Sequence, residues 1–455
     1  MNESRSINVQ SFLNEHPFSG FQWVIFAVCF LIVLLDGFDT AAIGFVAPSL
    51  IKEWGISRPE LGPVLSAALV GLSAGAFSAG PLSDRFGRRR VLLVSVALFG
   101  LACGASSLAA GLNQLMIMRF ITGLGLGAAM PNAVTLMSEY CPDQRRATLT
   151  NTMFCGFPLG AALGGFVAAW MIPNWGWRSV FILGGVAPLL LVVVMLVVMP
   201  ESVRYMVAKA QPAERIRAVL RRISSTVEGA TSFVMTERAA PTDAKGGMGV
   251  VLSRSYVVGS MMLWLTYFMG LVIFYSLINW MPVLFKDIGL DPRTAALISA
   301  LFPLGGVGAV FFGWLMDRFN ANLVIAIGYA LTAVTIYAIG QVGNAVGPLM
   351  ITVFVGGALM NMSQTSLPSL AAAFYPTQGR ATGVAWMMGI GRFGGIAGSF
   401  LVAELTRRQF NFSEIFTVMA VPGLIAMAAL LIKQFAHPEN ALKVGTVQAD
   451  EVLGH

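Results

Sequence analysis

The chain has 455 residues, of which 56% are hydrophobic and 11% are charged, and its formal net charge is +7. Soluble globular chains carry about 25% charged residues, so this composition excludes a protein whose whole surface faces water. The basic residues are scattered among loops rather than gathered in one patch, which argues against a nucleic-acid partner.

The first segment, residues 1–21, is polar and lacks the basic start and apolar core of a cleavable signal peptide. We therefore expect an N-terminal tail there, followed by a first helix that is retained. The four cysteines lie in or beside apolar runs and show no CxxC spacing. Neither a disulfide framework nor a metal site is expected from them.

Twelve apolar runs follow in chain order, and each approaches the ~20 residues that an α-helix needs to cross a bilayer. Six of them lie near residues 22–48, 60–82, 90–111, 114–138, 147–172 and 179–199. The other six lie near residues 254–282, 291–314, 320–341, 345–372, 381–405 and 413–433. The predicted fold is an all-α membrane protein with twelve transmembrane helices.

A polar, arginine-rich stretch separates the two groups of six runs. It contains Arg215, Arg217, Arg221 and Arg222, and it is typical of a solvated linker that carries one surface helix. The predicted organisation is therefore a six-helix bundle at 22–199, a linker at 200–253, a second bundle at 254–433 and a C-terminal tail at 434–455.

The distribution of positive charge indicates the orientation. Most of the 29 Lys and Arg residues fall in the tails, the linker and those loops that share a side with the N-terminus. Cytoplasmic loops carry an excess of Lys and Arg, so both termini are expected in the cytoplasm.

The two halves of the chain resemble each other. Segment 80–86 matches segment 313–319, and segment 142–148 matches segment 376–382 at almost the same offset. Because each repeat has six helices, both copies share one membrane orientation, as in the parallel repeats of major facilitator transporters. The substrate is then expected near the bilayer midplane, between the halves.

Local motifs carry a family resemblance. Residues 80–89 read GPLSDRFGRR, which resembles the G-x-x-x-D-R-x-G-R-R signature of the major facilitator superfamily, and residues 119–127 resemble its second motif. Residues 35–39 read LDGFD, which resembles the D-G-x-D signature of the aromatic acid:H+ symporter family. Segments 264–271 and 374–383 are similar to the 4-hydroxybenzoate/protocatechuate permeases of that family, and the likeness spans nearly the whole chain.

The superfamily resemblance implies a conformational latch at the cytoplasmic ends of the helices. Carboxylates and arginines would pair there in one conformation and separate in another. An ordinary positive-inside loop explains the arginines but not the ordered Gly and Asp positions. The candidate latch residues are Gly80, Asp84, Arg85, Gly87, Arg88, Glu139, Arg146, Asp317, Arg318 and Arg380.

Two aspartates near the middle of the first predicted helix are candidates for proton coupling. Asp36 and Asp39 are spaced i, i+3 and so lie on one face. An ionised aspartate at that depth costs roughly 2.5–3.5 kcal/mol, so it must face a polar cavity, pair, or take a proton. Arg119 in the fourth predicted helix is the candidate counter-ion. The alternatives are a structural ion pair, or carboxyl groups that only hold a helix bend at Gly37.

Arg392, inside the eleventh predicted helix, is the candidate for substrate binding. It lies among small residues, and a guanidinium matches a carboxylate in bidentate geometry. We therefore expect it to hold the acid group of an aromatic substrate. Candidates for stacking on the ring or bonding its hydroxyl groups are Tyr267, Tyr275, Phe154, Trp386, Asn361 and Gln364, followed by Phe157, Trp280, Asn132 and Asn279.

Together these features predict a proton-coupled symporter that imports aromatic carboxylates such as 4-hydroxybenzoate or protocatechuate by alternating access. The expected partners are the aromatic acid, protons and the lipid bilayer, without a cofactor or metal. We expect a monomer in a bacterial inner membrane.

Two other functions remain open at this stage. A proton antiporter that exports aromatic metabolites or drugs would share the fold, but its signature is only partly matched around Pro158, where the proline is displaced. A chemoreceptor for aromatic acids would need a signalling domain. An enzyme is not expected, because no nucleophile and base pairing, metal cluster or phosphate loop is recognisable.

Overall fold

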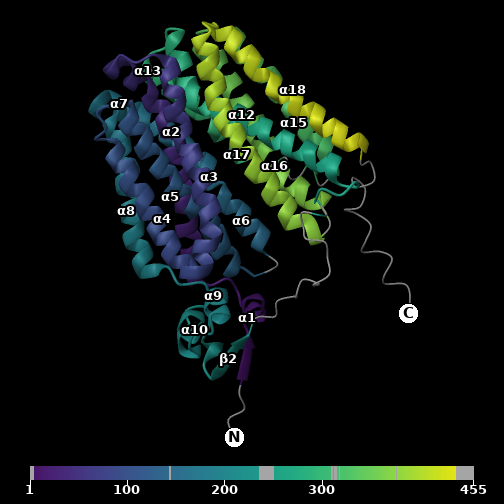
Figure 1. Cartoon of the computed structure of the whole chain (residues 1–455). Helices are drawn as coiled ribbons and strands as arrows, with labels where there is room; N and C mark the ends of the chain where they lie inside the picture. Colours follow the sequence, from purple (N-terminus) through teal and green to yellow (C-terminus); the bar gives the residue numbers. More distant parts are fainter. Residues whose placement is uncertain are drawn as a thin grey trace. The chain divides into compact units, whose positions relative to one another are not determined.

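The computed structural model describes residues 5–142, 145–234, 249, 251–308, 311, 315–316, 318–375 and 377–436. Long helices dominate it, as Figure 1 shows. Within these residues, eleven helices are long and apolar enough to cross a membrane. This is the helix content expected of a multi-pass membrane protein.

The helices of the first predicted group follow the apolar runs closely. They are α2 (Gly20–Trp54), α3 (Leu61–Phe86), α4 (Arg88–Ser106), α5 (Leu112–Glu139), α6 (Arg146–Phe154), α7 (Gly156–Trp175) and α8 (Arg178–Val198). The fifth predicted span is divided into α6 and α7 at Cys155. Pro158 has no N–H to donate to the carbonyl of Phe154, so the helical hydrogen-bond pattern is interrupted there.

The second group shows the same agreement. Its helices are α12 (Val257–Asp287), α13 (Pro292–Leu304), α15 (Ala321–Val342), α16 (Val346–Phe374), α17 (Thr377–Arg407) and α18 (Phe412–Ala436). A 3-10 helix, η4 (Gly305–Gly308), continues α13. Residues 309–310 and 312–314 of the eighth predicted span lie outside the described part of the chain.

The chain divides into two compact units. Unit 1 contains residues 1–42, 67–164 and 171–240, and unit 2 contains residues 43–66, 165–170 and 241–455. The ends of α2 and α3 therefore belong with the second group of helices. Within unit 2, Arg58 pairs with Asp287 at 2.5 Å, and Lys286 Nζ donates to the carbonyl of Pro48 at 3.4 Å.

Close backbone contacts hold the helices of unit 1 together. A Cβ on Gly160 of α7 would lie 1.8 Å from the carbonyl oxygen of Leu34 in α2, and one on Gly123 of α5 would lie 1.9 Å from that of Ala68 in α3. Helices in lipid associate through van der Waals packing, which small residues strengthen by letting backbones approach. Any larger residue at these two positions would push the helices apart.

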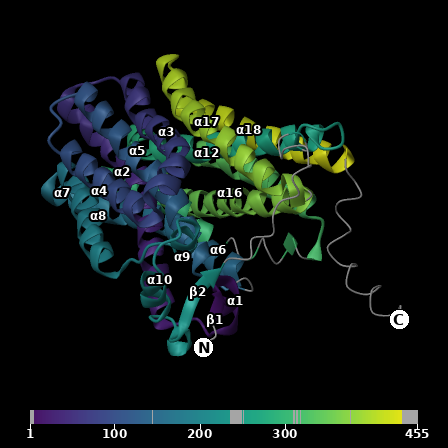
Figure 2. The same ribbon diagram turned by 60° about the horizontal axis from the view of Figure 1, so that its bottom comes forward.

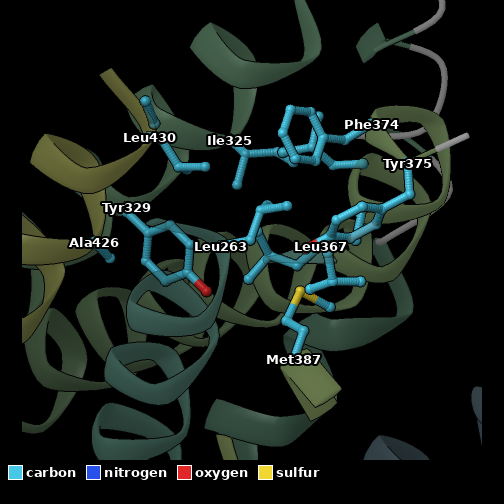
Figure 3. Packing of buried hydrophobic residues seen from close by; sticks show 13 residues of the cluster. Leu263, Ile325, Tyr329, Leu367, Phe374, Tyr375, Met387, Ala426 and Leu430 are labelled. Atoms are coloured by element: carbon cyan, nitrogen blue, oxygen red, sulfur yellow. The ribbon is translucent and has the colours of Figure 1, made fainter. Parts of the chain in front are cut away.

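Unit 2 has a buried cluster between α12, α15, α16, α17 and α18, which Figure 3 shows from close by. Its labelled members are Leu263, Ile325, Tyr329, Leu367, Phe374, Tyr375, Met387, Ala426 and Leu430. Tyr329 is fully buried, yet its side chain ends in a hydroxyl group that needs a hydrogen-bond partner. That partner belongs to the polar cluster around Arg392.

The N-terminal tail and the linker fold together, as Figure 2 shows. The elements are β1 (Arg5–Asn8), α1 (Val9–Glu15), α9 (Val203–Ala208), α10 (Ala213–Leu220), η3 (Ser225–Val227) and β2 (Ala230–Val234). The two strands pair in parallel. The Asn8 side chain caps α1 by accepting from the N–H groups of Gln10 and Ser11.

This arrangement corrects the expectation of a solvated linker with one surface helix. The linker has two short helices, because Pro212 at the N-cap begins α10 after α9 has ended. Ile216 and Leu220 of α10 are buried, and Arg204 of α9 donates to Gln10 of the tail at 2.8 Å. Residues 200–234 of the linker are thus folded together with residues 5–15 of the N-terminal tail.

Candidate functional site

A buried ion pair joins Asp39 of α2 to Arg119 of α5. Nη1 of Arg119 donates to Oδ1 of Asp39 at 2.7 Å, and Nη2 donates to Oδ2 at 2.8 Å. The two side chains are 0% and 1% exposed for Arg119 and Asp39 respectively. Such a fork occupies both carboxylate oxygens and fixes their orientation. The structure therefore brings together two of the three residues assigned to proton coupling.

A third side chain, that of Cys103, also contacts this ion pair. Cys103 of α4 donates from Sγ to Oδ1 of Asp39 at 3.1 Å, and the Arg119 guanidinium carbon lies 5.8 Å from the centre of the Phe181 ring of α8. Four helices thus enclose the ion pair. The sequence assigned no role to Cys103, because nothing in the local pattern distinguishes it from the other three cysteines.

Asp36 lies one helical turn before Asp39 and is 2% exposed. Next to it, Gly37 faces α7 so closely that a Cβ would lie 2.0 Å from the carbonyl oxygen of Phe157. α7 therefore packs on α2 beside the acidic residues, and the side chains of both aspartates are buried. A carboxyl group in such surroundings must be compensated by a positive charge or polar groups, or carry a proton.

In unit 2, Arg392 of α17 lies beside Tyr267 of α12. Arg392 is half-buried and interacts electrostatically with the Tyr267 side chain. A Cβ at Gly391 would lie 2.1 Å from the Tyr267 ring, and one at Gly395 would lie 2.6 Å from the ring of Tyr275. The two predicted tyrosines therefore pack along the glycine-rich face of α17, next to the predicted substrate arginine.

The predicted amides differ in how their donors are used. Asn361 of α16 donates to the carbonyls of Gly357 and Phe302 at 2.8 and 3.3 Å. Asn279 of α12 donates to Ser399 Oγ at 3.0 Å, and Asn132 of α5 donates to a carbonyl of its own helix at 2.8 Å. Asn361 and Asn279 therefore connect neighbouring helices, whereas the bond of Asn132 lies within α5.

Gln364 of α16 is arranged differently. Its Oε1 accepts from the hydroxyl of Tyr329 at 2.5 Å, its Nε2 donates to the carbonyl of Tyr267 at 3.4 Å, and its side chain interacts with that of Tyr267. The structure thus connects Gln364 to the residues around Arg392. Sequence reasoning missed Tyr329, since a tyrosine in an apolar helix is usually a packing residue.

Two other predicted aromatic residues have surroundings of their own. Trp386 of α17 stacks on Trp264 of α12, with ring centres 5.9 Å apart and an interplanar angle of 27°, and it is 46% exposed. Phe154 is the last residue of α6 and belongs to unit 1.

Some of the predicted latch residues have contacts within unit 1. Nε of Arg88 lies 3.6 Å from Oε1 of Glu139, and the backbone N–H of Arg89 donates to Oε1 of Glu201 at 3.1 Å. Gly87 has φ +93°, and a Cβ there would lie 2.3 Å from the Glu201 carboxylate, so glycine is required. Glu201 was missed, although a carboxylate directly after the sixth span is unusual on an arginine-rich side.

Tyr140 reinforces the same contact. Its hydroxyl donates to the carbonyl of Glu201 at 2.6 Å, and its carbonyl accepts from Gln22 at 2.7 Å. Burial raises the pKa of the Tyr140 phenol well above its usual range, so the hydroxyl keeps its proton and remains a donor. The segment after α8 is therefore fixed to the ends of α2 and α5.

The other latch candidates are less informative. Arg85 lies with its guanidinium 5.2 Å from the Phe86 ring, and Arg318 is exposed. Gly80 lies within α3. The side chains of Asp84, Arg146, Asp317 and Arg380 lie outside the described part of the structure.

Two six-helix groups, related by sequence repeats and each with an arginine inside a membrane helix, define a membrane transporter of the parallel-repeat class. The chain belongs to the Major Facilitator Superfamily, whose family model matches residues 29–307 and 263–449. The predicted superfamily and its all-α fold are confirmed.

Relatives of known function are also transporters. The chain is 50% identical to the 4-hydroxybenzoate transporter PcaK of Pseudomonas putida, over 94% of this chain and 96% of that protein. It is also 50% identical to the protein of the same name from Pseudomonas aeruginosa, with the same coverage. A gallate transporter of Pseudomonas putida is 43% identical over 93% of this chain and 94% of that protein. These relatives are transporters, and the chain is accordingly a transporter and not an enzyme.

Solved structures share the fold. The xylose transporter XylE from E. coli, in an inward open conformation, matches with a TM-score of 0.71 at 20% identity, over 91% of this chain and 96% of that one. A structure described as a D-xylose-proton symporter matches with a TM-score of 0.69 at 21% identity, over 91% and 97%. At such identities the likeness concerns the fold alone.

Proposed function

We propose that the chain is a proton-coupled symporter that imports aromatic carboxylates, such as 4-hydroxybenzoate or protocatechuate, by alternating access. The observation that carries this proposal is the 50% identity, over nearly the whole chain, to two 4-hydroxybenzoate transporters. The gallate transporter, at 43% identity, also takes a hydroxylated benzoate. A ring with a carboxylate and at least one hydroxyl group is the shared chemistry.

In this proposal Arg392 binds the substrate carboxylate. It is half-buried, so it is partly desolvated and still reachable, and Tyr267 and Tyr275 lie along the same helix face. A charge-assisted hydrogen bond in such surroundings is about twice as strong as a neutral one. The tyrosine rings offer apolar contact for the substrate ring. Trp386 and Asn361 have weaker support, because each has another partner.

The proton is assigned to Asp36. Both oxygens of Asp39 are engaged by the fork to Arg119, and Cys103 donates to one of them, so the part of Asp39 in this proposal is the ion pair itself. Asp36 lies on the same helix face and is buried. In the proposed cycle, Asp36 takes up a proton on the outside, the acid binds, and both are released inside after the two halves have rearranged.

The cytoplasmic contacts among Arg88, Glu139 and Glu201 would stabilise one of the two end conformations. Their separation in the other conformation is part of the proposal, as is a location in a bacterial inner membrane with cytoplasmic termini and a monomeric state. A C-terminal tag that is cleaved by protease only in inside-out vesicles would support that orientation. Cleavage in right-side-out vesicles would contradict it.

Uptake into proteoliposomes tests the function. Purified protein is reconstituted at pH 7 inside, labelled 4-hydroxybenzoate is added outside at pH 6, and accumulation is compared with vesicles treated with a protonophore. Passive entry of the neutral acid is measured in protein-free vesicles. The proposal expects accumulation above that background only with the gradient. Uptake that is indifferent to the gradient would contradict proton coupling.

The same vesicles distinguish the symporter from the alternative, a proton antiporter. One proton transported with one monoanion moves no net charge, so an imposed membrane potential would leave uptake unchanged, whereas each net charge moved contributes ~2.3 kcal/mol per 100 mV. An antiporter would instead move the labelled acid against the direction of the proton gradient. Uptake that requires an acidic interior would therefore replace the symporter by the exporter.

A further inference from the structure

Tyr329 of α15 joins the apolar cluster of unit 2 to the candidate substrate site. Its side chain is 0% exposed, and its hydroxyl donates to Oε1 of Gln364 at 2.5 Å. Both partners are buried, so the bond is not exchanged with water. A buried hydroxyl and a buried amide that lose each other are left unsatisfied, at a cost that far exceeds the net value of an exposed hydrogen bond.

The geometry settles which end of the Gln364 amide faces which neighbour. The backbone carbonyl of Tyr267 lies 3.4 Å from the amide and can only accept a hydrogen bond, so the nitrogen Nε2 must face it. Oε1 then faces Tyr329 and accepts its proton. Tyr329 thereby prevents the amide from turning over and keeps its N–H groups directed toward Tyr267.

The Tyr267 side chain follows Gln364 in the series of contacts that leads from Tyr329 to Arg392. It interacts with the Gln364 side chain and with Arg392. Oε1 of Gln364 is engaged by Tyr329, and the nitrogen that faces Tyr267 can only donate, so the Tyr267 oxygen is placed to accept from the amide and its phenolic hydrogen is left for another acceptor. Arg392 has no acceptor atom either. A carboxylate between Tyr267 and Arg392 accepts from both.

Gly270 leaves no room for a side chain beside the hydrogen bond between Tyr329 and Gln364. A Cβ at that position of α12 would lie 1.8 Å from Oε1 of Gln364 and 2.5 Å from the Tyr329 hydroxyl. Alanine would therefore displace the amide, the phenol, or both. This glycine borders the hydrogen bond itself, one turn after Tyr267 on the same helix.

We propose that Tyr329 is a positioning residue of the substrate site: through Gln364 it aims the hydroxyl group of Tyr267 at the carboxylate that Arg392 binds. The inference rests on the proposed function, because it takes an aromatic carboxylate as the ligand. Tyr329 itself is too deeply buried to touch that ligand. Its effect is on the strength and selectivity of carboxylate binding.

Two substitutions break the series at different points. Tyr329→Phe keeps the ring and removes the hydroxyl, and Gly270→Ala displaces the two bonded groups without removing any of their atoms. Both are expected to raise KM for 4-hydroxybenzoate by about tenfold, the value of one hydrogen bond to a charged group. The maximal uptake rate should change by less than about twofold, because the proton-carrying residues are untouched.

Matched controls exist on two of the helices of the same unit. Tyr337→Phe removes a hydroxyl from a tyrosine of α15 that is 49% exposed. Gly389→Ala adds a methyl group to α17 where a Cβ meets nothing within 4 Å. Neither control should change KM. A third measurement uses 4-hydroxybenzyl alcohol, which lacks the carboxylate, as a competitor whose inhibition constant should stay the same in Tyr329→Phe.

The outcomes separate this inference from the function on which it rests. If the unaltered protein takes up no 4-hydroxybenzoate, the proposed function fails and the inference with it. If it does, an unchanged KM in Tyr329→Phe overturns the inference alone. An equal loss of affinity for 4-hydroxybenzyl alcohol overturns it as well, since that result indicates a general disturbance of packing. A selective loss for the carboxylate in both variants supports it.

Discussion

The two arginines inside the membrane helices are held in opposite ways. Arg119 is fully buried, and both of its terminal nitrogens are occupied by Asp39. Arg392 is half-buried on a glycine-rich helix beside a tyrosine. A buried charge with a matched partner is a fixed part of a structure, whereas a charge that stays reachable can attract a ligand. The first arginine therefore suits a structural and coupling role, and the second suits a binding site.

Among the substitutions that test this comparison of the two arginine regions, the largest effect on transport is expected at Asp36. Asp36→Asn removes a titratable group and keeps the shape, so accumulation driven by a pH gradient should be lost entirely. Exchange of labelled for unlabelled 4-hydroxybenzoate across vesicles without a gradient should persist, because it needs no net proton movement. Gradient-driven accumulation at the normal level would remove Asp36 from the proton role.

Breaking the fixed pair should be the next largest effect. Arg119→Gln leaves Asp39 buried without its partner and is expected to lower the free energy of unfolding by about 3–5 kcal/mol. Thermal unfolding of the purified protein in detergent measures the loss. The double variant Arg119→Gln, Asp39→Asn should recover most of it, because no lone charge remains. If Arg119→Gln unfolds at the same temperature as the unaltered protein, the ion pair does not stabilise the fold.

A smaller effect is expected at the reachable arginine. Arg392→Gln should weaken 4-hydroxybenzoate binding by about 1.5–3 kcal/mol, a tenfold to hundredfold rise in the dissociation constant, with the unfolding temperature unchanged. Arg392→Lys should give an intermediate value, because lysine keeps the charge and loses the planar fork. Equal affinity in Arg392→Gln and the unaltered protein would place the carboxylate elsewhere.

The smallest effect concerns the thiol that supports Asp39. Cys103→Ala should cost about 0.5–1.5 kcal/mol of stability, the value of one hydrogen bond, and Cys103→Ser should cost less because it keeps a donor. Thermal unfolding compares the two variants, and KM should stay the same in both. An alanine variant as stable as the serine variant would show that the thiol contributes packing only.

Much of this architecture follows from the sequence. The ends of α2 and α8 lie within a few residues of their apolar runs, except where α2 continues to Trp54, because hydrophobicity changes sharply at the membrane boundary. The pairing of Asp39 with Arg119 was also predictable. Opposite charges buried in neighbouring apolar helices have few other partners, so the identity of the residues nearly determines the contact.

Other features depend on which helix faces meet, and local patterns do not contain that information. The sequence around three of the residues named above contains no motif that marks them, and each has a role only through a partner on another helix or segment. They are Tyr329, Cys103 and Glu201. The break at Cys155 was missed for a different reason. The run from 147 to 172 contains no charged residue that would mark a break, and Pro158 was considered only as part of a motif.

The strand pair of the folded linker also constrains the order of events during synthesis. β1 precedes α2 and β2 follows α8, so their parallel pairing encloses all seven helices from α2 to α8. Residue 234 must have left the ribosome before the pair can close, and contacts between such distant segments form late. Closure therefore marks a completed first half of the chain, and a polypeptide ended before residue 230 would leave the N-terminal strand without its neighbour.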